Sequence, residues 1–227
     1  MSGVVESLPA MEERRFAYDL LRRSFREEPS LPYLEVMTKE DVIESFPFVK
    51  ENSSINEGVE LIKSYVSQHD VFDKEIYEQL HWDYTRMFIG PYTLPAPLWE
   101  SAYVSEERLL FQEDTLKVRR EYFKYNFLPK NYGHEAEDHL GLELDFMFQL
   151  NELCITYLVG QDIAALQSVL KDQAAFLSRH LQNFVPRIVL NILNSAETDF
   201  YRGLAKVLEG FLETDTDLLK ELLAELQ

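Results

Sequence analysis

Apolar residues recur along this chain at intervals of three and four, and sustained alternation of apolar and polar residues is absent. Such intervals place side chains on one face of an α-helix, whereas a half-buried strand would alternate. In the first half, the pattern is carried by Tyr18, Leu21 and Phe25, by Val59, Ile62 and Val66, and by Phe72, Ile76, Leu80, Tyr84 and Met87. The pattern therefore predicts an all-α fold.

The second half continues the helical pattern. Its apolar faces are Leu109, Leu116, Phe123 and Phe127, then Phe200, Leu204, Val207, Leu208 and Phe211, and finally Leu218, Leu219, Leu222 and Leu223. Between them, residues 140–158 are apolar nearly all round, which predicts a central buried helix. We expect a multi-helix bundle of ten or more helices with no sheet. Residues 1–227 are predicted to form a single domain. If this domain is loosely divided into two parts, we expect the division near residues 129–137.

Polar residues and glycine mark several predicted helix ends. Ser54 and Glu57 have the spacing of a capping box. Asp138 stands just before the predicted buried helix and is expected to cap it. Gly160 is expected to end that helix, and Asp162 to cap the next one.

Two loops interrupt the helical pattern. The first, Gly90 to Trp99, contains prolines at 91, 95 and 97. Proline lacks a backbone donor and biases the preceding residue away from helix, so the helix that carries Met87 must stop near Gly90. The second loop runs from Pro129 to Glu137. Structured loops in a helical protein are common places for function, so we expect ligand binding there.

Charge narrows the choice of partner. The chain has 40 acidic and 22 basic residues, a net charge of −18. It should repel phosphate backbones, so no nucleic acid is expected, and it should attract a basic partner. The alternative is that the acidity only keeps the protein soluble.

Composition also suggests a compartment. The single cysteine, Cys154, allows no internal disulfide, which fits a reducing compartment. We find no secretory signal and no apolar run of about 18 residues, so we expect a cytoplasmic protein without membrane insertion.

The strongest enzyme hypothesis is a helical metal-dependent hydrolase that uses Glu135, Asp138, His139 and Glu143. His139 and Glu143 are four residues apart and share a helix face, a spacing that can hold a metal ion. However, His-Glu-x-x-His and Walker-type glycine-rich motifs are absent. Cys154 lies among apolar residues and is expected to be inert. We therefore expect no catalytic residues, metal or other cofactor, and the hydrolase remains an alternative.

Several motifs resemble those of the TorD/DmsD family, which includes NarJ-like redox-enzyme maturation chaperones. Residues 84–91 (YTRMFIGP) resemble its aromatic-x-Arg-Leu-Phe-x-Gly-Pro run. Residues 94–103 (LPAPLWESAY) resemble the proline-rich stretch that follows, most closely in DmsD-like members. Residues 135–143 (EAEDHLGLE) resemble its Glu-Pro-Asp-Asp-His-x-Gly-x-Glu signature. Further matches near the C-terminus extend the resemblance over about residues 11–211.

The resemblance implies an all-α chaperone. Such chaperones bind the twin-arginine signal peptide of a molybdenum-cofactor oxidoreductase subunit and hold the apo catalytic subunit until its cofactor is inserted and export is permitted. The positions that the family associates with peptide binding are Tyr84, Met87, Phe88, Trp99, Asp138 and His139. We add Pro97 from the proline-rich loop, and Glu135 because a carboxylate can bind an arginine guanidinium through two parallel hydrogen bonds.

Other interpretations of the same residues remain open. An apolar stripe at helical spacing, such as Tyr84, Met87 and Phe88, is often core, and Trp99 could cover the core as a plug. The chain could also be an adaptor that binds a folded enzyme subunit and ignores its signal peptide. Both a monomer and a domain-swapped dimer are compatible with the family.

Overall fold

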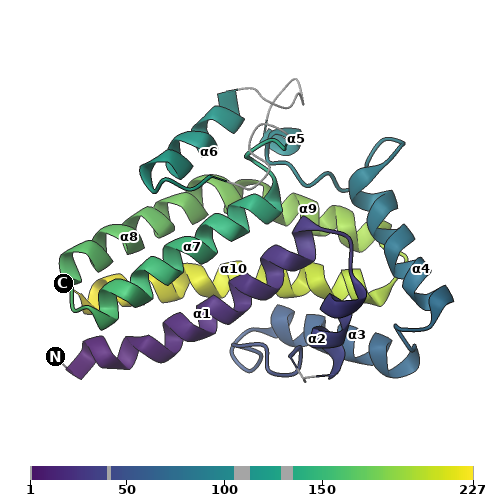
Figure 1. Cartoon of the computed structure of the whole chain (residues 1–227), viewed down its shortest axis with the longest axis horizontal. Coiled ribbons are helices and arrows are strands. Elements are labelled where there is room, and N and C mark those ends of the chain that lie inside the picture. Colours follow the sequence, from purple (N-terminus) through teal and green to yellow (C-terminus); the bar gives the residue numbers. More distant parts are fainter. Residues whose placement is uncertain (1, 40–41, 105–112, 129–134, 227) are drawn as a thin grey trace. The chain divides into compact units, whose positions relative to one another are not determined.

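The computed structural model describes residues 2–39, 42–104, 113–128 and 135–226. In these ranges the chain forms α-helices and two π-helical turns, and no strand (Figure 1). The α-helices are α1 (Ser2–Arg26), α2 (Leu31–Lys39), α3 (Ser53–Gln68), α4 (Lys74–Tyr84), α5 (Ser101–Val104), α6 (Glu113–Lys124), α7 (Leu140–Val159), α8 (Ile163–Phe176), α9 (Gln182–Ser195) and α10 (Asp199–Glu225). The π-helical turns are η1 (Thr85–Ile89) and η2 (Leu177–Leu181). The all-α prediction, with about ten helices, is confirmed.

Contacts within the chain define two compact units. Unit 1 comprises Met1–Arg23, Trp99–Phe184 and Leu212–Gln227, and unit 2 comprises Ser24–Leu98 and Val185–Phe211. Each unit is therefore built from segments far apart in the sequence. Much of the expected division near 129–137 lies outside the described residues, and the single-domain organisation stays a prediction. No helix among the described residues combines the length and apolar character needed to cross a membrane.

Helix α7 forms the centre of unit 1. Its first half, from Leu140 to Met147, is buried nearly all round as the sequence predicted, whereas Gln149, Thr156 and Val159 in its second half are exposed. Phe146 of α7 packs against Phe176 of α8 and Tyr122 of α6, with ring centroids 4.9 and 4.8 Å away. The predicted helix ends are also confirmed here, because Gly160 follows α7 and the Asp162 carboxylate accepts a hydrogen bond from Ala165 N at the start of α8.

A buried polar network joins four helices of unit 1. Arg14 of α1 is fully buried and donates hydrogen bonds to Asp215 of α10 at 2.5 Å, Asn151 of α7 at 2.7 Å and Gln173 of α8 at 3.0 Å. Tyr18 donates to the same Asp215. A buried charge is costly unless paired, so these partners hold the four helices in one arrangement.

This network corrects the prediction for the C-terminal segment. The apolar faces from Phe200 to Phe211 and from Leu218 to Leu223 were expected to belong to two separate helices. Instead, α10 continues from Asp199 to Glu225. Asp215 lies in the polar gap, and its pairing with Arg14 makes a charged residue part of the core.

Helix α3 and the first part of α10 pack very closely in unit 2. A Cβ atom on Gly58 would lie 2.5 Å from the carbonyl oxygen of Gly203, so neither position has room for a side chain. The N-cap of α3 is Asn52, whose side chain accepts hydrogen bonds from Ser54 N and Ile55 N. The predicted Ser54 capping box is therefore wrong, because the N-cap lies two residues earlier and Asn52 supplies the acceptor.

Helix α6 buries a different face from the one predicted. Val118 and Tyr122 are buried, whereas Leu116 and Phe123 are 40% and 50% exposed. The Tyr122 hydroxyl donates to the carbonyl of Glu137, so its hydrogen bond and the aromatic cluster of unit 1 decide which face turns inward. Of the other two predicted members, Phe127 is half-buried against Tyr122, with ring centroids 4.8 Å apart, and Leu109 lies outside the described residues.

Candidate functional site

The first motif lies at the end of α4 and in η1, within unit 2. Tyr84, Met87 and Phe88 are all buried, with at most 2% of their surface exposed. Tyr84 and Phe88 meet edge to face at 4.8 Å, and both pack near Tyr201 of α10. The three motif side chains therefore form part of the core of unit 2, and their contact with a peptide stays a prediction.

The same helical segment presents other side chains outward. Trp82, Arg86 and Ile89 recur every three or four residues, out of phase with the buried positions. Trp82 and Ile89 are 63% and 57% exposed, and Tyr92 in the following loop is 87% exposed. Sequence analysis missed these residues because it assigned apolar positions to the core. The sequence does carry a signal for Trp82, because it is an aromatic residue at a helix position outside the stripe of buried residues.

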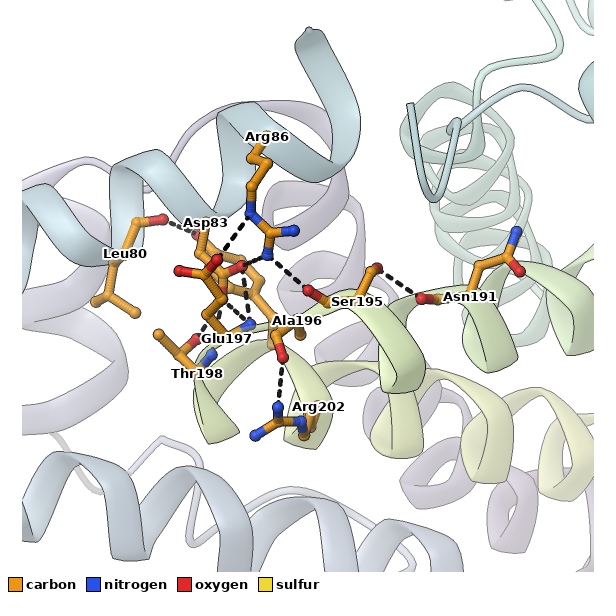
Figure 2. Close-up of polar contacts among 10 residues, drawn as sticks. Leu80, Asp83, Arg86, Asn191, Ser195, Ala196, Glu197, Thr198 and Arg202 are labelled. Carbon is orange, nitrogen blue, oxygen red and sulfur yellow. Dashed lines mark hydrogen bonds and ion pairs between the residues drawn. The ribbon is translucent and has the colours of Figure 1, made fainter. Parts of the chain in front are cut away.

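Asp83 and Arg86 attach this segment to the turn between α9 and α10 (Figure 2). The buried Asp83 carboxylate accepts hydrogen bonds from Glu197 N and from both Thr198 N and its hydroxyl, at 2.8 to 3.1 Å. Arg86 donates to Asp83 at 2.8 Å and to the carbonyl of Ser195 at 2.6 Å. These contacts hold one side of the helical segment against the turn between α9 and α10.

The proline-rich loop starts where it was predicted to start. Gly90 has φ of 109°, a conformation that favours glycine, and its N–H donates to the carbonyl of Thr85 to close the π-helical turn. Ala96 N donates to the carbonyl of Met87, which folds the loop back on η1. Pro97 is half-buried at the end of the loop, in the same unit as the first motif.

Trp99 and the acidic turn meet within unit 1. The Trp99 indole N–H donates to Oε1 of Glu135 at 2.9 Å. Its ring contacts the ring of His139 edge to face at 5.4 Å, and the two residues form an isolated backbone bridge. Both Trp99 and Glu135 are half-buried. The end of the proline-rich loop therefore lies against the acidic turn, while residues 129–134 lie outside the described residues.

Asp138 is fully buried, and its contacts correct its predicted role. Its carboxylate accepts hydrogen bonds from Ser101 N at 2.8 Å and from the Thr115 hydroxyl at 3.0 Å. The side chain that caps α7 belongs to His139, whose Nδ1 accepts from Gly141 N at 3.1 Å. Asp138 was expected to cap α7, but it points to the start of α5 and holds that short helix instead.

Two more acidic side chains of unit 1 are buried and bind basic residues. Glu100 accepts from His180 Nδ1 at 2.9 Å, and Glu137 binds Arg119 through two hydrogen bonds of 2.7 and 2.9 Å. The partners of Glu100 and Glu137 are up to 80 positions away in the chain. Only folding brings these side chains together.

Glu143 is the most unusual acid of this cluster. It is fully buried beside the carboxylates of Glu100 and Asp138. Burial, followed by the nearby charges of Glu100 and Asp138, raises the pKa of the Glu143 carboxyl well above its usual value. A proton on this carboxyl removes one negative charge from the cluster.

The hydrolase alternative finds no matching centre in the described part of the chain. No group of three or more His, Cys, Asp or Glu side chains there is arranged to hold a metal ion. The oxygens of Asp138 and the Nδ1 of His139 already accept hydrogen bonds from the protein. The hydrolase is therefore not favoured.

The predicted site residues thus fall into two sets. Trp99, Glu135, Asp138 and His139 come together in unit 1, whereas Tyr84, Met87, Phe88 and Pro97 belong to unit 2. The first set combines an indole, an imidazole and half-buried to buried carboxylates. Such a surface is suited to a ligand that carries both positive charge and apolar groups.

Fold and site together define an all-helical protein with an acidic and aromatic candidate binding site. A family model described as "nitrate reductase delta subunit" matches residues 52–189. This match covers more than half of the chain, which therefore belongs to that family.

Three relatives illustrate the similarity. The "Tat proofreading chaperone DmsD" of Salmonella typhimurium is 38% identical over 64 residues, 28% of this chain and 31% of the relative. The "Probable Tat proofreading chaperone DmsD" of Haemophilus influenzae is 24% identical over 63% of this chain and 64% of the relative. The "Chaperone protein TorD" of Aliivibrio salmonicida is 23% identical over 92% of this chain and 95% of the relative. The first alignment thus spans less than a third of its relative, and the last nearly all of it.

Proposed function

We propose that this protein is a redox-enzyme maturation chaperone that binds the twin-arginine signal peptide of a molybdenum-cofactor oxidoreductase subunit. It holds the apo subunit while the cofactor is inserted, and it acts in the cytoplasm before export. The role is binding and not catalysis.

The observation that carries this proposal is the similarity to proteins named as TorD and DmsD chaperones, which for one relative extends over nearly the whole of both chains. The names of the DmsD relatives include the words "Tat proofreading", which supports a twin-arginine signal peptide as the ligand.

The chemistry of the acidic turn supports the same choice. A signal peptide has a basic segment followed by an apolar one. Glu135 offers a half-buried carboxylate beside the Trp99 indole, so a guanidinium and an apolar side chain could bind at adjacent positions. The net charge of −18 would also speed the approach of a basic peptide at low salt.

Isothermal titration calorimetry tests the proposal. The probe is a synthetic twin-arginine leader of a molybdoenzyme subunit encoded beside this gene. We expect a dissociation constant in the micromolar range, about −8 kcal/mol, because the client must later be released. A peptide with both arginines replaced by lysine is the matched control and should bind more weakly, since lysine does not form the paired hydrogen bonds.

A pull-down separates this function from an adaptor. The bait is the purified chaperone, and the prey is the client subunit with or without its leader. Loss of capture on removing the leader supports signal-peptide binding. Equal capture of both forms, together with no heat of binding for the peptide, would refute the proposal and favour the adaptor.

A further inference from the structure

A carboxyl group next to Trp99 in the chain meets two other buried side chains of unit 1, and we name the three residues the Glu100 clamp: Glu100, Glu143 and His180. We propose that Glu143 and Glu100 share one proton, and that this proton makes the position of Trp99 in the candidate site depend on pH. The inference goes beyond the proposed function, because it concerns how the site is held in place and not which ligand binds there.

Three acidic side chains lie close together in the interior of unit 1. Glu100, Asp138 and Glu143 are buried, and the charges of the first two act on Glu143. Like charges repel strongly in a protein interior, and each ionised carboxylate also loses its hydration there. One of the three carboxyl groups is therefore expected to keep a proton.

The hydrogen bonds around these three side chains identify the carboxyl group that keeps the proton. The Asp138 carboxylate accepts hydrogen bonds from a backbone N–H and from a hydroxyl group. Oε2 of Glu100 is 2.9 Å from His180 Nδ1. Donors of this kind favour the ionised forms of Asp138 and Glu100, so the proton belongs on Glu143. Burial, followed by the charges of Glu100 and Asp138 and a hydrogen bond with Glu100, raises the pKa of the Glu143 carboxyl well above its usual value.

A shared proton also explains how the two glutamates can bind each other. An ionised carboxylate only accepts hydrogen bonds, so two ionised carboxylates would repel each other. With one proton, Glu143 donates to Glu100, and the pair carries one negative charge instead of two. Glu100 is then held by Glu143 on α7 and by His180 on η2, whose ring packs against Phe176 with the centroids 4.7 Å apart.

The other titratable groups around Glu143 do not supply a positive charge to it. Glu137 is bound by Arg119 through two hydrogen bonds, so that guanidinium is already compensated. The Tyr122 hydroxyl of α6 stays neutral, because burial and then the charge of Glu143 raise its pKa well above the usual value. The Nδ1 of His139 accepts a hydrogen bond from the backbone, so this ring is neutral as well. The N-terminus of α7 favours negative charge near Glu143, but burial has the larger effect.

The Glu100 clamp is connected to Trp99 through the backbone. Glu100 directly follows Trp99 in the chain, and its N–H donates to the carbonyl of Asp138 at 2.9 Å. Ser101 N donates to the Asp138 carboxylate at 2.8 Å. The Trp99 indole itself donates to Oε1 of Glu135. A displacement of Glu100 therefore displaces Trp99, and with it the hydrogen bond that joins the proline-rich loop to the acidic turn.

The direction of the pH effect follows from the charge on Glu143. Below the pKa of Glu143 in the folded protein, the shared proton is present and Glu100 is held from both sides. When pH rises through that pKa, Glu143 becomes ionised and repels Glu100 and Asp138. We expect the hydrogen bond between Trp99 and Glu135 to be intact while Glu143 keeps its proton and to weaken once Glu143 is ionised.

Fluorine NMR on the ligand-free protein tests the shared proton, so the result does not depend on the proposed function. Trp82 and Trp99 are the two tryptophans of the chain, and Trp82→Phe leaves Trp99 as the single site for 5-fluorotryptophan. Trp82 is 63% exposed, so this parent variant should fold normally. We expect the Trp99 signal to move between about pH 5 and about pH 9 along one titration curve, while the helical circular dichroism stays constant.

Three further substitutions in the Trp82→Phe parent identify the titrating group. Glu143→Gln keeps a donor toward Glu100 but does not titrate, so the curve should disappear. Glu100→Gln removes the neighbouring charge and should lower the midpoint by about one pH unit, a roughly tenfold change in proton affinity. Asp217→Asn is the matched control, because it removes an acidic side chain that is 76% exposed on α10 of unit 1, and it should leave the midpoint unchanged.

A curve that is absent in Glu143→Gln and shifted downward in Glu100→Gln supports the shared proton. A signal that stays in place over the whole pH range overturns it. A curve that persists in Glu143→Gln also overturns it, because His139 or Glu135 then causes the change. If Glu143→Gln does not fold, Glu100→Gln decides: a midpoint lowered by about one pH unit supports the inference, and one within about 0.3 units of the parent overturns it. Movement of the Trp99 signal that coincides with loss of helical circular dichroism shows unfolding and overturns the inference as well.

Discussion

The indole N–H of Trp99 donates a 2.9 Å hydrogen bond to Oε1 of Glu135, 36 residues later in the chain. This contact connects the end of the proline-rich loop with the acidic turn. Because of this hydrogen bond, an arginine that binds the Glu135 carboxylate would bind the same group as the Trp99 indole. Occupation of the acidic turn should therefore change the environment of Trp99.

Replacing Glu135 by glutamine separates its charge from its hydrogen bond. The glutamine amide keeps an oxygen that can accept from Trp99, so the fold should be unchanged, but it lacks the charge that attracts a guanidinium. We expect about tenfold weaker binding of a twin-arginine leader, equal to about 1.4 kcal/mol. Calorimetry measures this loss. Wild-type affinity in Glu135→Gln would show that Glu135 only positions Trp99.

Asp138→Ala should destabilise the protein by about 2–4 kcal/mol. The substitution leaves the Ser101 N–H and the Thr115 hydroxyl without their buried acceptor, and unsatisfied buried donors are costly. Urea unfolding followed by circular dichroism measures the change. The control is Asp162→Ala, an exposed helix cap that should cost only about 1 kcal/mol. Equal losses in the two variants would show that burial of Asp138 contributes nothing.

Glu143→Gln should stabilise the protein more at pH 7.5 than at pH 5. Burial and the charges of Glu100 and Asp138 raise the pKa of Glu143 above its ordinary value of 4.5, so the folded state keeps a proton that the unfolded chain releases. The contribution of Glu143 to the free energy of unfolding of the wild type therefore falls as pH rises from about 4.5 toward the pKa of Glu143 in the folded state. Glutamine does not titrate.

The gain in Glu143→Gln relative to wild type should grow by about 1 kcal/mol or more between the two pH values. Urea midpoints at both pH values provide the measurement. A gain that is the same at pH 5 and pH 7.5 would contradict a raised pKa at this position.

Gly203→Ala should destabilise unit 2 by about 1–3 kcal/mol through overpacking. A Cβ on Gly203 would lie 2.6 Å from the carbonyl oxygen of Gly58 and 2.6 Å from the Ile62 side chain, so α3 and α10 must move apart. Gly160→Ala is the control, because Gly160 is exposed after α7 and its nearest contact would be 3.1 Å. Thermal unfolding compares them, and an unchanged melting temperature for Gly203→Ala would contradict the close packing.

Cys154 should be unreactive in the folded protein. It is fully buried, and burial raises the pKa of its thiol to about 12, so almost no thiolate exists at pH 8. We expect a disulfide reagent such as DTNB to label native protein at least about 100-fold more slowly than protein unfolded in guanidinium, since thiolate fraction and access both limit the rate. Comparable rates would show that α7 opens readily.

The residues of the candidate site illustrate the reach of sequence-based inference. The motif around Trp99 and the acidic turn was recognised from local order and spacing, and the structure brings Trp99, Glu135 and His139 together. The burial of Asp138 was not foreseen, because its partners Ser101 and Thr115 lie far away in the chain. The neighbouring residues in the sequence do not distinguish an aspartate that caps the helix directly after it from one that binds the start of a different helix.

By itself, the sequence determined the helical class of this protein and several helix ends, because apolar periodicity, proline and glycine act through neighbouring residues. Tyr18, Leu21 and Phe25 share a buried face, and Gly90 ends the η1 turn as predicted. Only the tertiary structure decided which polar residues are core. Arg14 makes Asp215 a buried partner and lets α10 continue through a polar segment. The free energy of a buried charge depends on the group it meets, and that group is chosen by the packing of distant helices.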